Sequence, residues 1–454
     1  MTPRRARASP DAAELFDRAS RGTVVDLFAG AGGISEGFRQ AGFKIIAGSD
    51  YDPDATATYA LNFPGADVVT GDIRQSTIKQ RILSAAKDAS IVVGGPPCQA
   101  FSQVRNFSRM IDDPRNSLYR EFVDVISAAR PVAFLMENVT GIDELGMREQ
   151  MLSDLSIGGA YKVRGQVVNA ADFGVPQTRK RLLFIGLREE LSTEPPELRG
   201  TRATDAVSLA RFNGVAPAHY KIVAQTPLDG KNVLLALKDK EDKSVVSAAD
   251  AISDLAGLPV GNRLDELPCS ELAPAATAYQ REMRKGAGKT ITNVQVPRIN
   301  VDTAIRLESI PPGGNHRDLP DELLERYISG QKWGQDNGSG KLSRRHFYAY
   351  RRLHPGIWAW TLTTKGDCVY HYKHARALSV REFARLQSFP DRFTFTTDPR
   401  VGQIEGRHSE GAAHSRYRQV GNAVPPLLAK AAAQAIRASL RKALSSEGLK
   451  TLAA

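Results

Sequence analysis

Short apolar runs alternate with longer amphipathic segments through the first half of the chain. The apolar runs are rich in β-branched residues and predict buried strands at 23–28, 44–49, 67–71, 91–93, 131–136 and 182–186. Segments at 34–41 and 119–129, which lie between such runs, have the apolar spacing of amphipathic helices. Strands that alternate with helices form a mainly parallel sheet covered on both faces, so the pattern predicts a doubly wound α/β fold.

The first predicted strand is followed by a glycine turn at 29–33 and then by a helix. This order is typical of a nucleotide-binding half-sheet, in which the turn brings the backbone close to a ligand. Ser35 stands where the third glycine of the dinucleotide fingerprint belongs, so the turn favours a nucleoside ligand without a phosphate over a nicotinamide dinucleotide. Asp50 ends the second strand, where its carboxylate can accept hydrogen bonds from both hydroxyls of a ribose.

Two further carboxylates follow predicted strands. Asp72 comes after the third strand, and two roles are open for it: a ligand contact, or simply a helix N-cap. Glu137 follows the strand at 131–136, at the edge of an open α/β sheet where ligands bind.

The fourth strand runs into Gly94-Gly95-Pro96-Pro97, which stiffens the chain directly before Cys98. Most lone cysteines are small buried thiols, and that is the alternative role for this residue. Burial of a thiol does not require so rigid a lead, so the segment favours Cys98 as a nucleophile.

The segment 177–181 carries three positive charges beside another predicted strand. In an extended chain Arg179 and Arg181 point to one side, together with Gln177, and Lys180 points to the other. A solvated basic strand edge would have the same pattern, so the spacing alone leaves both roles open.

The composition is that of an ordinary globular protein, with 454 residues of which 42% are hydrophobic and 24% charged, enough for two domains. A net charge of +11 favours a polyanionic partner. Three widely spaced cysteines, Cys98, Cys269 and Cys368, argue for a reducing compartment and against a disulfide framework or a Cys-x-x-Cys metal site. We find no apolar run long enough for a membrane span and no signal peptide, and therefore expect a cytoplasmic protein.

The composition changes between residues 258 and 375, where glycine, basic and aromatic residues are interleaved. Stretches such as Arg344-Arg345-His346-Phe347-Tyr348 suit contacts with phosphates and base edges. Such a stretch is about as often the solvated face of a strand, so the composition alone does not assign a role to this region.

Taken in order, these segments resemble the bacterial DNA (cytosine-5) methyltransferases. Six motifs carry the resemblance, in the family's order: Asp26-Leu27-Phe28-Ala29-Gly30-Ala31-Gly32-Gly33, Gly95-Pro96-Pro97-Cys98-Gln99, Glu137-Asn138-Val139, Gln177-Thr178-Arg179-Lys180-Arg181, Arg381-Glu382-Phe383-Ala384-Arg385-Leu386-Gln387-Ser388-Phe389-Pro390 and Gln419-Val420-Gly421-Asn422-Ala423-Val424-Pro425-Pro426. The resemblance spans most of the chain, from residue 23 to residue 429. One departure is Tyr372, where the family often has proline, and it lies outside the catalytic motifs.

The resemblance implies a doubly wound, Rossmann-like S-adenosylmethionine-dependent methyltransferase sheet with an inserted, smaller target-recognition domain. It implies methyl transfer from S-adenosylmethionine to carbon 5 of a cytosine that is flipped out of duplex DNA. Cys98 would then add to carbon 6 and Glu137 would protonate N3, while Arg179 and Arg181 would orient the base carbonyl, the phosphate or Glu137. No metal is implied, and the donor-binding residues would be Phe28, Gly30, Gly32, Gly33, Asp50, Tyr51, Asp72, Ile73, Pro96, Leu118 and Asn422.

The motif positions also predict domain boundaries: a basic tail at 1–20, a catalytic domain at 21–257, a target-recognition domain at 258–411, a segment at 412–446 that completes the catalytic domain, and a tail at 447–454. The segment 99–115 is expected to close over the flipped base. We expect a monomer that binds duplex DNA, contacts no membrane, lies in the bacterial cytoplasm at the nucleoid, and acts beside a separate cognate restriction endonuclease. Two alternatives stay open, a catalytically silent DNA-binding relative and the same chemistry on RNA.

Overall fold

The structure of the protein is a computed structural model, and it describes residues 10–97, 117–144, 146–200, 246–329, 349–400 and 412–445. The predicted nucleophile Cys98, the segment 99–115 and the Arg344-Arg345 stretch lie outside the described residues. Within the described ranges, no helix is both long enough and apolar enough to cross a membrane.

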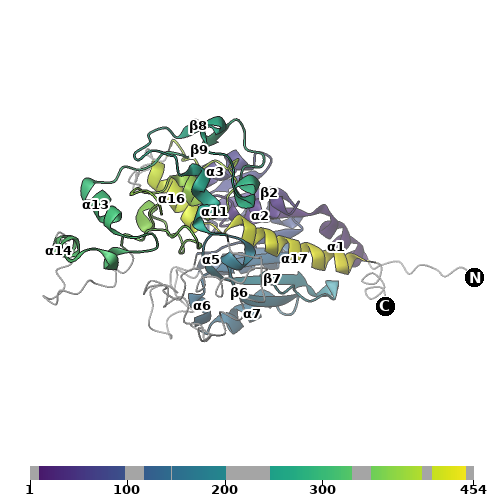
Figure 1. The fold of residues 1–454 in the computed structure, drawn as a ribbon. Coiled ribbons are helices and arrows are strands. Elements are labelled where there is room, and N and C mark those ends of the chain that lie inside the picture. Colours follow the sequence, from purple (N-terminus) through teal and green to yellow (C-terminus); the bar gives the residue numbers. More distant parts are fainter. Residues whose placement is uncertain are drawn as a thin grey trace, which may run out of the picture.

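A seven-stranded sheet forms the centre of the molecule, with the strand order β3-β2-β1-β4-β5-β7-β6 (Figure 1). Its strands are β1 (Thr23–Leu27), β2 (Lys44–Asp50), β3 (Asp67–Thr70), β4 (Ile91–Gly94), β5 (Ala133–Asn138), β6 (Tyr161–Asn169) and β7 (Lys180–Arg188). Strands β1 to β5 are parallel, whereas β7 pairs antiparallel with both β5 and β6. The strand order reverses at β1, which lies between β2 and β4, and open α/β sheets bind their ligands outside such a switch point.

Helices cover both faces of the sheet, so neighbouring residues of a buried strand pack into two different cores. Val24 belongs to the core beneath α1 (Pro10–Arg21), α2 (Gly33–Gln40), α3 (Pro53–Asn62) and α17 (Pro426–Leu444). Val25 belongs to the opposite core, beneath α4 (Ser76–Asp88), α5 (Ser117–Ala129) and α7 (Arg148–Ser156), with the short α6 (Gly141–Glu144) nearby. The predicted doubly wound α/β architecture is therefore confirmed.

Helix α17 packs closely on α2, although the two helices lie far apart in the sequence (Figure 1). Two glycines of α2 permit this approach. A Cβ atom on Gly37 would lie 2.5 Å from the Cβ of Ala429, and one on Gly33 would collide with the carbonyl oxygen of Val424. The C-terminal segment thus completes the helical layer over β1 and β2.

A smaller region projects from the sheet and holds the elements labelled β8, β9, α13 and α14 in Figure 1. Its elements are β8 (Glu266–Pro268), α12 (Ala278–Met283), β9 (Thr290–Thr292), α13 (Val301–Ser309) and α14 (Asp321–Ser329), and α11 (Ala248–Ile252) precedes them. Leu258, Ile291, Val294 and Val296 form a small separate core here. Most of this core lies inside the predicted recognition domain, and Leu255 joins it from the end of the predicted catalytic domain.

The last part of the predicted insert packs on helices beside the catalytic sheet instead of projecting from it. Helix α15 (Val380–Leu386) contacts α11 and α16 (Ala412–Asn422). Beyond it, Arg392 forms an ion pair with Glu36 of α2. The backbone N–H of Thr394 donates to the Asn62 side chain at the end of α3. A boundary near residue 356 fits these contacts, together with the hydrogen bond from Arg179 to the carbonyl oxygen of Leu362, better than the predicted one at 411.

The predicted N-terminal tail also differs from the structure, because residues 10–20 lie within helix α1. Its Arg18 donates hydrogen bonds to the carbonyl oxygens of Ala86 and Ala89 at the end of α4, and to that of Ala129 at the end of α5. Carbonyl groups at a helix C-terminus have no partner within the helix, so one guanidinium group stabilises two helix ends. Helix α1 is therefore part of the folded domain.

Candidate active site

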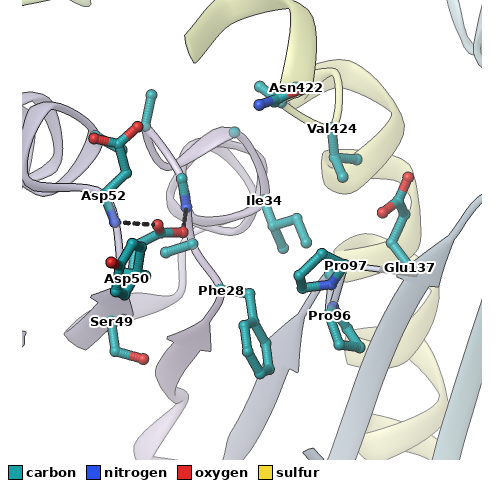
Figure 2. A pocket seen from close by; sticks show the side chains of 18 of the residues that line it. Phe28, Ile34, Ser49, Asp50, Asp52, Pro96, Pro97, Glu137, Asn422 and Val424 are labelled. Carbon is teal, nitrogen blue, oxygen red and sulfur yellow. Dashed lines mark hydrogen bonds between the residues drawn. The ribbon is translucent and has the colours of Figure 1, made fainter. Parts of the chain in front are cut away.

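A pocket of about 760 Å³ opens at the carboxyl edge of the sheet, beside the switch point between β1 and β4. Figure 2 shows Asp50 and Glu137 at opposite ends of this pocket, with Phe28 and Ile34 between them. Among the residues predicted to bind a donor, those that line it are Phe28, Gly30, Gly33, Asp50, Tyr51, Asp72, Ile73, Pro96, Leu118 and Asn422.

The glycine turn after β1 shapes one wall of the pocket. Phe28 and Gly30 both adopt a φ of 54°, in the left-handed region, and Gly32 has a φ of 99°. Gly32 does not line the pocket, and a Cβ on it would lie 2.6 Å from the ring of Phe63. This glycine is therefore needed for backbone conformation and packing, and its contact with the donor stays a prediction.

Asp50 is held in place by the backbone around it. Its Oδ2 atom accepts a hydrogen bond from the N–H of Gly30 at 2.8 Å, and its Oδ1 atom accepts one from the N–H of Asp52 at 2.8 Å (Figure 2). Burial raises the pKa of the Asp50 carboxyl. A carboxylate oxygen accepts more than one hydrogen bond, so the fixed carboxylate keeps capacity for ribose hydroxyls.

Asp72 lines the pocket and is paired with Arg74, whose Nη2 lies 2.6 Å from its Oδ2. Hydrogen bonding to Arg74 lowers the pKa of Asp72. The N-cap of the following helix is Gln75. The alternative that Asp72 is simply a helix N-cap is therefore wrong, and its carboxylate is bound to Arg74 at the pocket wall.

Glu137 and Arg181 form an ion pair inside the pocket, with 2.5 Å between the Arg181 Nε and the Glu137 Oε1 atoms. Both side chains are largely buried, with 13% of Arg181 and 14% of Glu137 exposed. Glu137 lies near the end of β5 and Arg181 near the start of β7, which runs antiparallel to it. The pair thus fixes the direction of the Glu137 carboxylate at the edge of the sheet.

Arg179 is anchored to the main chain at both of its terminal nitrogens. Its Nη1 atom donates to the carbonyl oxygen of Leu362 at 3.1 Å, and its Nη2 atom donates to that of Gly421 at 2.8 Å. Burial, reinforced by the nearby Arg181, lowers the pKa of Arg179 well below its usual range. Lys180, between the two arginines, is exposed, which confirms that the side chains alternate in direction. Arg179 is buried, so it does not belong to a solvated basic strand edge.

The strand end that precedes Cys98 meets Glu137. A Cβ atom on Gly95 would lie 3.0 Å from the Glu137 Oε2 atom, and Pro96 and Pro97 both line the pocket. The carbonyl oxygen of Pro96 accepts a hydrogen bond from the Asn138 side chain at 3.3 Å. The last described residues before Cys98 therefore lie at the pocket, beside the Glu137 carboxylate.

Several pocket residues were missing from the sequence-based set, among them the charged residues Asp52 and Arg418. Arg418 of α16 lies 3.0 Å from Asp52, through Nη2 and Oδ2, and both residues line the pocket. The ion pair joins α16 to the loop after β2. Arg418 directly precedes the motif that begins at Gln419, and this adjacency is the only sequence signal that pointed to it.

A Rossmann-like methyltransferase is the class of protein that this sheet and pocket define, with the ligand pocket at the switch point and a fixed carboxylate on either side. A family model described as C-5 cytosine-specific DNA methylase matches residues 22–438. The chain belongs to this family and is a DNA (cytosine-5-)-methyltransferase.

Curated relatives and a solved structure agree with this assignment. The chain is 30% identical over 420 residues to the type II methyltransferase M1.HphI of Haemophilus parahaemolyticus, covering 91% of this chain and 86% of that relative. It is 32% identical over 425 residues to the type II methyltransferase M.DdeI of Desulfomicrobium norvegicum, covering 91% of this chain and 88% of that relative. A solved structure of a prophage-encoded DNA modification methyltransferase (E. coli) has a TM-score of 0.61 at 24% identity, covering 92% of this chain and 99% of that one, and shows the same fold.

Proposed function

We propose that the enzyme transfers a methyl group from S-adenosylmethionine to carbon 5 of a cytosine flipped out of duplex DNA, through a covalent adduct of Cys98 at carbon 6. The observation that carries this proposal is the meeting of three elements at one pocket. The Glu137–Arg181 pair, the strand end before Cys98 and the fixed Asp50 carboxylate all border the same space.

The pocket suits a nucleoside donor. A volume of about 760 Å³ lies within the usual range for sites that bind small molecules. Asp50 would bind the ribose hydroxyls, and Phe28 would face the sulfonium cation with its aromatic ring. S-adenosylmethionine, when bound, supplies an electrophilic methyl group.

The remaining chemistry falls to this chain's own residues. Carbon 5 of cytosine is a weak nucleophile until a thiolate adds at carbon 6, and Cys98 would form that bond. The added electron pair moves toward N3, where Glu137 would deliver a proton. After carbon 5 has gained the methyl group, a base removes the carbon 5 proton, the carbon–sulfur bond breaks to release the Cys98 thiolate, and N3 returns its proton to Glu137.

Arginines 179 and 181 take different parts in this proposal. Arg181 directs the Glu137 carboxylate through the ion pair and stays within the pocket, where it is able to meet the carbonyl of the base. Arg179, with both terminal nitrogens bound to carbonyl oxygens, holds neighbouring segments in position. Loss of Arg181 should therefore affect the rate more directly than loss of Arg179.

Sequence specificity belongs to the projecting region in this proposal. A cytosine inside a duplex must leave the base stack before carbon 6 is accessible, and the segment 99–115 would close over it. The region from 258 to about 356 would read the neighbouring base pairs, since base edges in the grooves carry the sequence information. The segment from 357 to 446 would complete the catalytic domain, in line with the contacts of Leu362, Arg392 and Thr394.

We further propose a monomer that acts on DNA at the bacterial nucleoid, beside a separate cognate restriction endonuclease. The type II names of M1.HphI and M.DdeI support the last part, since they describe modification enzymes. The alternative of a catalytically silent relative is disfavoured, because Glu137 and Arg181, two of the residues proposed for catalysis, are both present and form an ion pair. The RNA alternative is disfavoured by the DNA methylase family match.

Bisulfite sequencing of host DNA provides the test. Cells that express the enzyme should carry methylated cytosine at one short sequence, and cells that express Cys98→Ser should not. Host DNA without new methylation, from cells in which the enzyme is folded and binds S-adenosylmethionine, would contradict the proposed reaction. Methylation confined to RNA would support the alternative substrate instead.

A further inference from the structure

The turn between α16 and α17 carries Asn422, which lines the pocket and is exposed to it at the upper edge of Figure 2. The residues on both sides of Asn422 are fixed through their carbonyl oxygens. The carbonyl of Gly421 accepts the hydrogen bond from Arg179, and the carbonyl of Ala423 accepts one from the Gln387 side chain at 2.6 Å. The direction of Asn422 thus depends on two side chains from distant parts of the sequence.

Gln387 lies at the end of α15, is fully buried and does not line the pocket. Both ends of its amide are used. Its Nε2 atom donates to Ala423, and its Oε1 atom accepts a hydrogen bond from the Gln177 side chain. The Oε1 atom of Gln177 accepts in turn from the backbone N–H of Leu362 at 2.9 Å. The two glutamines form a directed chain in which each hydrogen bond polarises the next.

This chain of amides reaches the strand that carries the arginines. Gln177 lies two positions before Arg179, and both residues bind the main chain at Leu362, one through the N–H and one through the carbonyl oxygen. Gly421 leaves no room for adjustment, because a Cβ atom on it would collide with the carbonyl oxygen of Thr363. The Asn422 turn is therefore fixed relative to the strand that supplies Arg181 to Glu137.

We propose that Gln387 is a positioning residue for donor binding, whose amide keeps Asn422 turned into the pocket by holding the carbonyl of Ala423. The proposal rests on the proposed function, in which the pocket binds S-adenosylmethionine next to Asn422. It assigns a role in the reaction to a residue that contacts neither the donor nor the base.

A double-mutant cycle separates positioning from general support of the fold. The probe is S-adenosylhomocysteine, the demethylated product, whose affinity is measured by calorimetry because it undergoes no reaction. Gln387→Met keeps the volume but removes both hydrogen bonds, and it should raise the Kd about tenfold in the wild-type background. In an Asn422→Ala background the same change should alter the Kd by less than about twofold, since the positioned group is gone.

An isosteric variant keeps the test informative if Gln387→Met fails to fold. Gln387→Glu retains the acceptor for Gln177 but presents an oxygen to the carbonyl of Ala423. As a carboxylate this group repels that carbonyl, whereas as a neutral acid it donates a hydrogen bond, and burial favours the neutral acid. Its affinity for the probe should therefore be weak at pH 8 and recover toward the wild-type value at pH 5.5.

Gln280 offers a matched control, because its buried amide also makes two-ended hydrogen bonds, to Ala276 and Ser253, away from the pocket. Gln280→Met should lower the melting temperature and leave the probe's Kd unchanged. An affinity within twofold of wild type in both Gln387 variants would overturn the proposal, and so would equal weakening with and without Asn422. If the wild-type enzyme does not bind the probe at all, the proposed donor is wrong, which is a different outcome.

Discussion

The Nε atom of Arg181 lies 2.5 Å from the Oε1 atom of Glu137, at the single place where the parallel part of the sheet meets its antiparallel strand. Strands β1 to β5 bring their carboxyl ends to the pocket. Strand β7 runs the other way, so its first residues reach the same edge. An arginine at the beginning of β7 is thereby paired with a carboxylate at the end of β5.

The first prediction concerns the nucleophile. Cys98→Ser should abolish methyl transfer, by at least about a thousandfold, because a hydroxyl is far less ionised than a thiol. Donor affinity, measured by calorimetry, should stay close to wild type. Cys269→Ser is the matched control and should keep most activity, since its thiol donates only to the carbonyl oxygen of Gly288, away from the pocket. Turnover of Cys98→Ser within tenfold of wild type would exclude Cys98 as the nucleophile.

The second prediction concerns Glu137 as an acid. Glu137→Gln should lower the single-turnover rate about 10²–10⁴-fold, because an amide donates a hydrogen bond to N3 but not a proton. The amide oxygen can still lie beside the Arg181 guanidinium, so donor and DNA affinities should change little. A variant that keeps the wild-type single-turnover rate would exclude Glu137 as the acid.

The third prediction concerns Asp50. Asp50→Ala should weaken S-adenosylmethionine binding by on the order of 1.5–3 kcal/mol, the size of hydrogen bonds to a charged group. Part of this loss of affinity would come from the glycine turn, because the variant also removes the acceptor for the N–H groups of Gly30 and Asp52. Asp67→Ala is a suitable control, since Asp67 pairs with Arg81 on the exposed edge of the sheet. If calorimetry gave the same affinity for the Asp50 and Asp67 variants, Asp50 would not contact the donor.

The fourth prediction concerns stability and pH. Asp26 is fully buried on β1 and accepts hydrogen bonds from the N–H and hydroxyl of Ser35. Burial raises the pKa of Asp26 from an ordinary 3.8 to about 7. Between these values the folded chain keeps a proton that the unfolded chain has released. Asp26 therefore lowers the free energy of unfolding as the pH rises from about 4 to about 7, by up to ~1.4 kcal/mol per pH unit, and has a constant effect above that range.

Asp26→Asn removes this titration while keeping an acceptor for Ser35. Denaturant unfolding at pH 5 and pH 8 should show a smaller loss of stability with rising pH in the variant than in the wild type. The same difference between the two pH values in both proteins would mean that Asp26 is charged in the folded state.

The fifth prediction concerns sequence recognition. Residues 258–356 should be exchangeable for the corresponding segment of a relative that methylates another site, and the hybrid should methylate the donor's site. Residues 357–400 should stay with the host, because Leu362 binds Arg179, Arg392 pairs with Glu36 and Thr394 binds Asn62. Bisulfite sequencing gives the outcome. A folded hybrid that still methylates the host's site would refute the assignment of this region.

The sequence predicted the parallel strands well because each is a short β-branched run buried on both faces. Strand β6 was missed, since it is an edge strand with most residues only partly buried and therefore has no continuous apolar run. Helix α1 was missed because the basic residues before it suggested a solvated tail. The sequence also contained no signal for the direction of β7.

At the site, motifs identified the pocket residues but not their partners. Asp50, Asp72 and Glu137 were all found at strand ends, as the geometry of a parallel sheet requires. The different surroundings of Arg179 and Arg181 were not predictable, because they depend on carbonyl groups of Leu362 and Gly421 that come from distant segments. Long-range contacts of this kind are set by tertiary packing and have no local pattern.

The packing of α17 on α2 has a consequence for biosynthesis. Gly33 at the pocket wall touches the carbonyl of Val424, so the pocket is completed by residues made almost four hundred positions later. We expect a nascent chain on the ribosome to stay unable to bind its donor until this helix has emerged. For the same reason, a polypeptide cut within 401–411 should be active only when both pieces are produced together. If each piece is fused to one of two proteins that bind each other, DNA methylation would then report that interaction.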